Sequence, residues 1–169
     1  MDTTDIVEIY LELAQKLSNI NGIEWVDLWN NQVTNLDQEH PFPAPAVFLA
    51  FRSNNAKDLG EKMQDVTLMV DIFLFYETFA DSYHGAFNQE DALRFLSLQK
   101  EINKILHASQ GNHYSGMRRV GFSPVDTGDA GNLYTINYQC QMIDKSAMNA
   151  VETGSFNDIS VAKEPFIIP

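Results

Sequence analysis

The sequence predicts an α+β domain in which an antiparallel-rich β-sheet packs two α-helices on one face. Three observations support this fold class. The stretch 66–77, VTLMVDIFLFYE, alternates in character residue by residue, which is typical of a strand with one apolar face. The stretches 4–18 and 88–108 repeat apolar residues every three or four positions, as amphipathic helices do. The stretch 133–144 alternates again, so the expected order is α-β-β-β-α-β-β, followed by a C-terminal arm.

Length and cysteine content indicate one domain with its own core. The chain has 169 residues, which we divide into a domain at 1–145 and an extended arm at 146–169. A single cysteine, Cys140, excludes an internal disulfide framework and fits a reducing compartment. No apolar run is long enough to span a membrane, and the acidic start is unlike a signal peptide. We therefore expect neither secretion nor membrane insertion.

The charge balance is strongly acidic. The formal net charge is −12, from 11 basic and 23 acidic residues, and residues 1–40 alone hold eight acids and one base. Such a surface repels phosphate, so nucleic-acid binding by a basic face is disfavoured. The same charge is compatible with DNA sliding past without being held, and solubility is its simplest explanation.

The N-terminal third is expected to form a helix and two strands. Thr4 is the expected N-cap of a helix over 4–18, and a short strand follows at 23–29. Three prolines in the run EHPFPAP then impose an extended backbone before a strand at 46–52. The polar stretch 53–64, which contains a glycine, predicts a hairpin loop.

The long strand at 66–77 is expected in the middle of the sheet, because it is about twice the usual strand length. One of its faces is apolar and suits cover by a helix. The other mixes Phe73 and Phe75 with Asp71 and Glu77. This mixture indicates burial by something other than the main core, either another copy of the chain or a covering loop.

The C-terminal half predicts a helix and a closing hairpin. Asn88 is the expected cap of a helix that runs to about Ala108, and strands at 117–125 and 133–144 flank a turn-rich tip at 126–132. The expected buried stripe of the helix is Ala92, Phe95, Leu96, Gln99, Ile102, Ile105 and Leu106. Cys140 falls on the apolar face of the last strand and is expected in the core.

Motifs that carry catalysis or cofactor binding are missing from the sequence. There is no nucleotide-binding, zinc-protease or paired-cysteine motif, and the four histidines share no ligand spacing. Asp81, Ser82 and His84 lie close together, but no nucleophile elbow surrounds the serine. We therefore expect no enzyme, and no catalytic, cofactor-binding or metal-binding residue.

The surface features instead favour protein contacts. Arg118 and Arg119 are expected on opposite sides of their strand, where either a neighbour's acid or solvent meets them. The mixed face, the two tryptophans and the apolar clusters of the arm exceed what one core needs. The candidate interface residues are Phe73, Phe75, Trp25, Trp29, Arg118, Arg119, Phe156, Ile159, Val161, Phe166, Ile167 and Ile168.

The order of elements resembles the tail terminator, or tail completion, proteins of long-tailed bacteriophages. The resemblance covers residues 1–145 and rests on the strands PAVFLAF, DVTLMVDIFLFYE and YTINYQCQMID with the helices around them. It lies in pattern and topology and involves no fixed motif. The arm departs from the compact pattern of that family.

The resemblance implies a structural virion protein, assembled in the bacterial cytoplasm. It implies a hexameric ring that caps the tail tube, stops its polymerisation and joins it to a neck or head-closure protein, with DNA passing through the lumen unbound. Head-closure and neck-ring proteins of phages are the nearest alternative. A small hydrolase without a signature and a ligand-binding module are alternatives of other classes, which a strictly monomeric state would favour.

Overall fold

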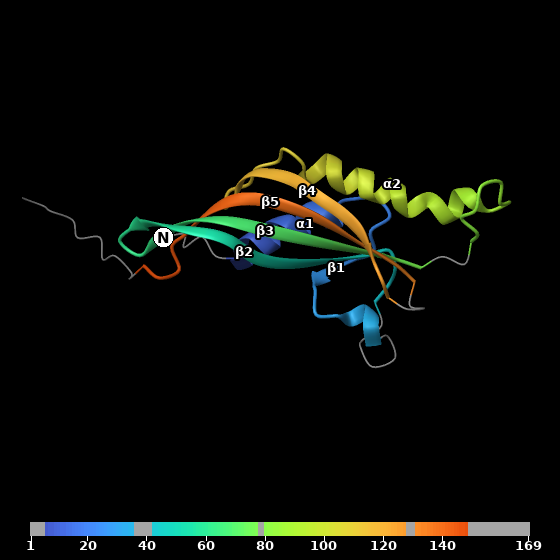
Figure 1. Cartoon of the computed structure of the whole chain (residues 1–169), viewed down its shortest axis with the longest axis horizontal. Coiled ribbons are helices and arrows are strands. Elements are labelled where there is room, and N and C mark those ends of the chain that lie inside the picture. The colour runs from blue at the N-terminus through green and yellow to red at the C-terminus, as the bar shows by residue number, and fades with distance from the viewer. Residues whose placement is uncertain (1–5, 36–41, 78–79, 128–130, 149–169) are drawn as a thin grey trace, which may run out of the picture.

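The chain folds into one mixed sheet with two helices, as the computed structural model shows (Figure 1), which describes residues 6–35, 42–77, 80–127 and 131–148. The elements are α1 (Ile6–Ser18), β1 (Trp25–Leu28), the 3-10 helix η1 (Gln32–Asn35), β2 (Ala46–Gly60), β3 (Met63–Tyr76), α2 (Gln89–Leu106), β4 (Ser115–Val125) and β5 (Asn132–Asp144). The predicted order α-β-β-β-α-β-β is confirmed.

The strands lie in the order β1-β2-β3-β5-β4. Every pair is antiparallel except β1 with β2, which is parallel. The long strand β3 is therefore central, as its length predicts. No local pattern in the sequence indicates the parallel pair, because strand direction within a sheet depends on contacts distant along the chain.

The main core lies between the helices and one face of the sheet. Val66, Leu68, Val70, Ile72 and Leu74 alternate along β3 and belong to a single buried cluster. Both helices contribute to that cluster with Ile9, Leu13 and Leu17 from α1 and Leu98, Ile102 and Leu106 from α2. Both helices therefore pack on the face of β3 that the sequence predicts to be covered by a helix.

The prediction of a hairpin loop over 53–64 is wrong, because β2 continues through this stretch to Gly60. Its polar residues pair with β3 from Leu68 back to Met63, and Glu61 and Lys62 make the turn with positive φ values. Polar side chains are compatible with a strand whose two faces both meet water. Loop composition therefore misled the prediction, and the result is a long exposed hairpin (Figure 1).

Helix α2 departs from the expected stripe in detail. Leu98 is buried, whereas Leu96 and Ile105 are exposed. Asn88 occupies the N-cap position, but its side chain makes no capping bond and accepts the backbone N–H of Asp81 at 3.2 Å. The helix is positioned by its apolar contacts and not by that cap.

Two titratable groups in the core predict a loss of stability at high pH. Burial raises the pKa of the Cys140 thiol from 9.0 to about 11, and burial, opposed by Arg119, raises the pKa of Tyr138 from 10.0 to about 12. The folded chain keeps protons that the unfolded chain releases, so stability falls as pH rises from about 9 through about 11 and on toward 12.

Thermal unfolding measured from about pH 8 to pH 11 tests this prediction. The variant Cys140→Ala should lose stability less steeply than the natural chain in this range, because it has one fewer group whose pKa changes on unfolding. Identical slopes for the two proteins would contradict it.

Candidate protein-contact surface

The second face of the sheet carries a small aromatic cluster at one end. Phe75 is 1% exposed and packs in this cluster with Val33, Ala46, Phe48 and Leu133. Phe42 meets Phe75 edge-to-face, with ring centroids 5.6 Å apart. The chain itself therefore covers Phe75, through residues that precede β2.

Phe73 is only partly buried, under the ring of Trp29. The two rings are stacked, with centroids 4.2 Å apart and planes at 11°. The covering loop, one of the two alternatives for this face, is thus what the described residues show. The role of Phe73, Phe75 and Trp29 in an interface between chains stays a prediction.

Beyond the aromatic cluster, the same face is polar. Asp71 lies centrally on β3, is 9% exposed, and accepts the Nε–H of Arg52 at 2.9 Å. Asn137 on β5 donates to the same carboxylate. The hydrogen bond to Asp71 is the first cause of the raised pKa of Arg52. This network links β2, β3 and β5 across a face that no described helix covers.

The two outer strands of the sheet, β1 and β4, have edges that are partly blocked by the chain itself. At the β1 edge, the N–H of Leu28 donates to the carboxylate of Asp27 at 2.7 Å, and its carbonyl accepts from Gln32 at 2.6 Å. Such caps are a common device against edge-to-edge association. Trp25 and Leu28 nevertheless remain 41% and 48% exposed at this edge.

The first half of the β4 edge is covered by the turn that follows α2. Met117 donates its N–H to Ser109 at 3.0 Å and accepts from the N–H of Ala108 at 2.8 Å. The N–H of Arg119 donates to Nδ1 of His107 at 3.2 Å. The outer backbone groups of β4 are thus occupied as far as Arg119.

Helix α1 holds this covering turn in place. Lys16 donates to the hydroxyl of Tyr114 at 2.7 Å and to the carbonyl of Gln110 at 3.3 Å, while Glu12 accepts the N–H of Asn112 at 3.2 Å. Desolvation, which lowers the pKa of Lys16, is outweighed by its hydrogen bonds to Tyr114 and Glu12, so that pKa is raised. The turn is therefore held in a defined position by its hydrogen bonds to α1.

The second half of β4 is open. A register shift at Val120 interrupts the strand, and the bonds to the 107–111 turn end before it. Val120 and Phe122 are 44% and 59% exposed. In the described part of the chain, the outer edge of β4 from Val120 to Val125 has no backbone partner.

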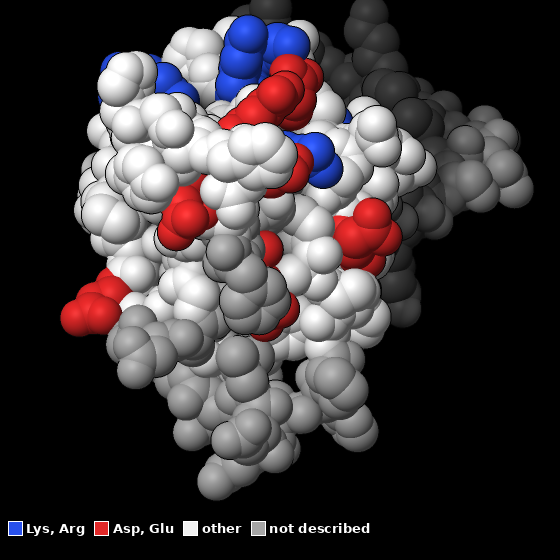
Figure 2. Space-filling model, turned by 90° about the vertical axis from the view of Figure 1, so that its right-hand side faces the viewer, with Lys and Arg blue, Asp and Glu red and all other residues white. Residues whose placement is uncertain are grey.

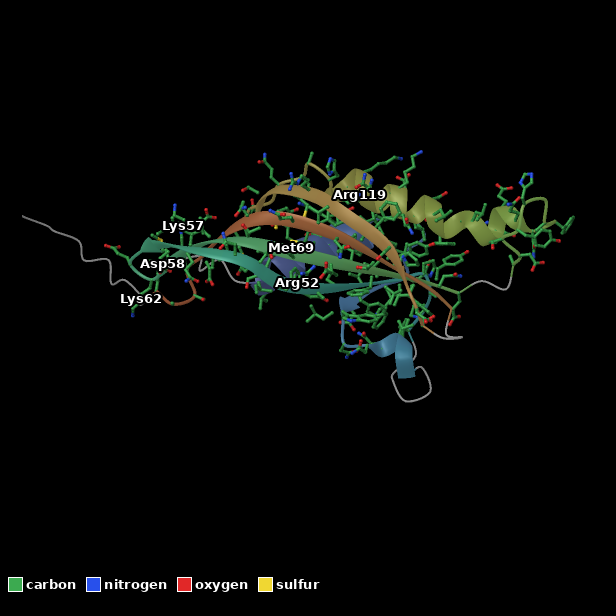
Figure 3. The ribbon with its side chains drawn as sticks, in the orientation of Figure 1. Arg52, Lys57, Asp58, Lys62, Met69 and Arg119 are labelled. Carbon is green, nitrogen blue, oxygen red and sulfur yellow. The ribbon has the colours of Figure 1, made fainter. Side chains whose placement is uncertain are left out.

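The outer edge of β2 is open beyond the segment that β1 covers. β1 pairs with β2 only from Ala46 to Leu49, and every residue from Arg52 to Gly60 is exposed. Figure 3 shows Arg52 at this margin, Lys57 farther along on the β2–β3 hairpin, and Arg119 at the opposite margin of the sheet. Considering only the described residues, each side of the sheet thus has a strand segment without a backbone partner.

Arg118 and Arg119 lie on opposite faces of β4, as predicted, because their partners on β5 are Gln139 and Tyr138. The guanidinium of Arg119 lies over the ring of Phe122, 5.5 Å from its centroid. Arg118 lies on the open polar face, level with Arg52. Whether either meets a neighbouring chain stays a prediction.

Charged side chains at one end of the molecule form no single-signed surface. Figure 2 shows acidic groups scattered over the end that lies at the right of Figure 1, with basic groups gathered along the upper margin. A continuous basic face is the usual mark of a nucleic-acid binder. This end of the described surface does not have one.

The residues considered as catalytic candidates do not form a site among the described residues. Ser82 and His84 are exposed loop residues, and no hydrogen bond joins them among the described contacts. Within 6–35, 42–77, 80–127 and 131–148, no group of three or more His, Cys, Asp or Glu is placed to hold a metal ion. None of the described helices combines the length and apolar character that crossing a membrane requires.

Half of the predicted interface residues are in the arm. Phe156, Ile159, Val161 and the cluster 166–168 lie outside the described residues. The predicted interface residues do not include the open half of β4, although Val120 and Phe122 follow an arginine pair and precede Pro124 in a strand. A proline within a strand is a mark of an edge, and this signal was available.

Comparison with known proteins gives matches of structure but not of sequence. No protein-family model matches the sequence, and no curated protein matches it in a sequence search. A chain of a solved structure titled "Virion of native gene transfer agent (GTA) particle" aligns with a TM-score of 0.48 and 10% identity, over 78% of this chain and 91% of that one. At this level of similarity, the function of the chain has to be inferred from its own surfaces.

Proposed function

We propose that this protein is a structural virion component that forms a ring, a hexamer by analogy with tail terminators. In this role the ring caps the tail tube, stops its polymerisation and joins it to the neck or head. The confirmed element order supports the proposal, because it is the order on which the resemblance to tail terminator proteins rests. The partners are copies of the same chain, a tail tube protein and a neck or head-closure protein, and DNA passes through the lumen unbound.

The observation that carries the ring is that the two sides of the sheet present different open surfaces. Among the described residues, β1 pairs with β2 only from Ala46 to Leu49 and leaves Arg52–Gly60 exposed, while Val120 and Phe122 are exposed on β4, at the opposite side. A closed ring uses head-to-tail contacts, for which each subunit needs two different patches. A twofold dimer needs only one.

Mass photometry and native mass spectrometry of the full chain at micromolar concentration test the ring. The expected result is one closed species of six chains, visible as an annulus by electron microscopy. Adding the ring to a polymerising tube of its own tail should stop growth at the ends. A strictly monomeric protein at this concentration would contradict the proposal and favour a monomeric enzyme or binding module.

Removal of the arm gives a separate prediction. We propose that residues 146–169 reach onto a neighbouring subunit or an adjoining tail protein, where each buried apolar side chain contributes about 1.5–3 kcal/mol before the entropy of ordering the arm is subtracted. The chain truncated after Met148 should keep the melting temperature of the monomer and fail to join the tail. A clearly lowered melting temperature would instead show that the arm packs on its own domain.

A further inference from the structure

We infer that neighbouring copies join through a staggered strand junction, in which the open half of β4 pairs with the outer half of β2 of the next copy. The open half of β4 is Val120–Val125, and the outer half of β2 is Arg52–Gly60. This inference rests on the proposed ring and names the surfaces that build it. The occupant of the open β4 edge is thus a second copy of this chain.

On one side of the sheet, β1 covers β2 at Ala46–Leu49 and leaves Arg52–Gly60 open. On the other side, the turn 107–111 covers β4 as far as Arg119 and leaves Val120–Val125 open. The two covered segments lie at opposite ends of the sheet. The register across the sheet aligns Leu28 of β1 with Phe122 of β4, through Leu49, Ile72 and Ile136. It aligns Arg52 with Arg118 in the same way. The open half of β4 is therefore level with the part of β2 that β1 covers.

An unstaggered junction is disfavoured by these covers. It would bring the open half of β4 against β1, whose outer groups at Leu28 are already bonded to Asp27 and Gln32. It would also bring the outer half of β2 against the turn 107–111, which α1 holds in place. Only a shift along the strands brings the two open halves together.

The size of this shift suits a closed ring. Ser123 is level with Phe48, so pairing it between Arg52 and Asn55 requires a shift of roughly four to seven residues across four strands. With strands about 4.8 Å apart and a rise of about 3.3 Å per residue, the strands tilt by roughly 35–50°. Closed barrels have strand tilts of about 35–45°, so a stagger of this size is compatible with a closed ring.

Strand direction and side chains agree with the same junction. β2 and β4 run in opposite directions within one copy, because β3 and β5 lie between them. Rotation about an axis along the strands keeps these directions, so the junction is antiparallel. Val120 and Phe122 lose exposed apolar surface there, and no charged side chain of Val120–Val125 opposes Arg52 or Lys57.

Paired cysteines in a Cys140→Ala background locate the junction in the full-length protein. Ser123→Cys with Asn55→Cys, treated with a short bismaleimide, should cross-link neighbouring copies into covalent ladders up to the ring. The pair Ser123→Cys with Trp25→Cys, which leaves the Asp27 carboxylate on Leu28 in place, reports the unstaggered alternative and should give no ladder. A ladder from the second pair alone would overturn the inference.

An edge variant provides the second measurement. Phe122→Asp should reduce the ring to folded monomers, because Phe122 is 59% exposed and contributes little to the core of its own subunit. Phe87→Asp, at a fully exposed phenylalanine before α2, is the matched control and should leave the ring intact. If the natural chain and Phe122→Asp both form rings, the proposed junction is wrong but the proposed ring is not. A natural chain that forms no ring overturns both.

Discussion

The variant Ile72→Ser is expected to be largely unfolded at room temperature. Ile72 is fully buried in the middle of the central strand, between the neighbouring strands and the helices. Truncating a buried isoleucine costs about 2–5 kcal/mol, and an unpaired buried hydroxyl adds about 1–3 kcal/mol. The sum is comparable to the whole stability of a domain, about 5–15 kcal/mol. Urea unfolding followed by circular dichroism measures the loss.

Thr67→Ser on the same strand is the matched control. The hydroxyl of Thr67 points to the polar face and hydrogen-bonds the amide of Gln141 on β5, a contact that serine preserves. It should shift the urea midpoint only slightly. If Ile72→Ser were as stable as Thr67→Ser, the assignment of the helix-covered face of β3 would be wrong.

The fold class followed from the sequence because its main signals are local. Alternation along β3 and β5 and the helical spacing in α1 each reflect one face buried against one core. The outer half of β2 was missed because both of its faces are exposed, so no alternation marks it. The parallel pairing of β1 with β2 was missed because strand order depends on contacts distant in the sequence.

The contact surface was less accessible to sequence reasoning. Phe73 and Phe75 were recognised as an excess of apolar residues, but the sequence does not show that Trp29 and Phe42 return to cover them. Blocked and open strand edges depend on which backbone groups find partners, such as Met117 with the turn after α2. Backbone pairing of this kind leaves little trace in residue types.

The variant Phe75→Ser is expected to destabilise the isolated chain by about 3–5 kcal/mol, the usual cost of truncating a buried phenylalanine. Its ring is 1% exposed and anchors the residues before β2 through Phe42 and Phe48. The sequence marks Phe73 and Phe75 alike as candidate interface residues on the mixed face of the strand. The structure separates them, because Phe75 lies inside the chain's own aromatic cluster.

Phe73→Ser is the control that makes this separation measurable. It removes a partly exposed ring and its stacking on Trp29, an aromatic pair contributing about 0.5–1.5 kcal/mol beyond the buried area. Its melting temperature should therefore fall much less than that of Phe75→Ser, while any defect in ring formation remains visible by mass photometry. Equal stability of Phe75→Ser and the natural monomer, together with loss of the ring, would mean that another subunit and not the chain's own loop covers this face.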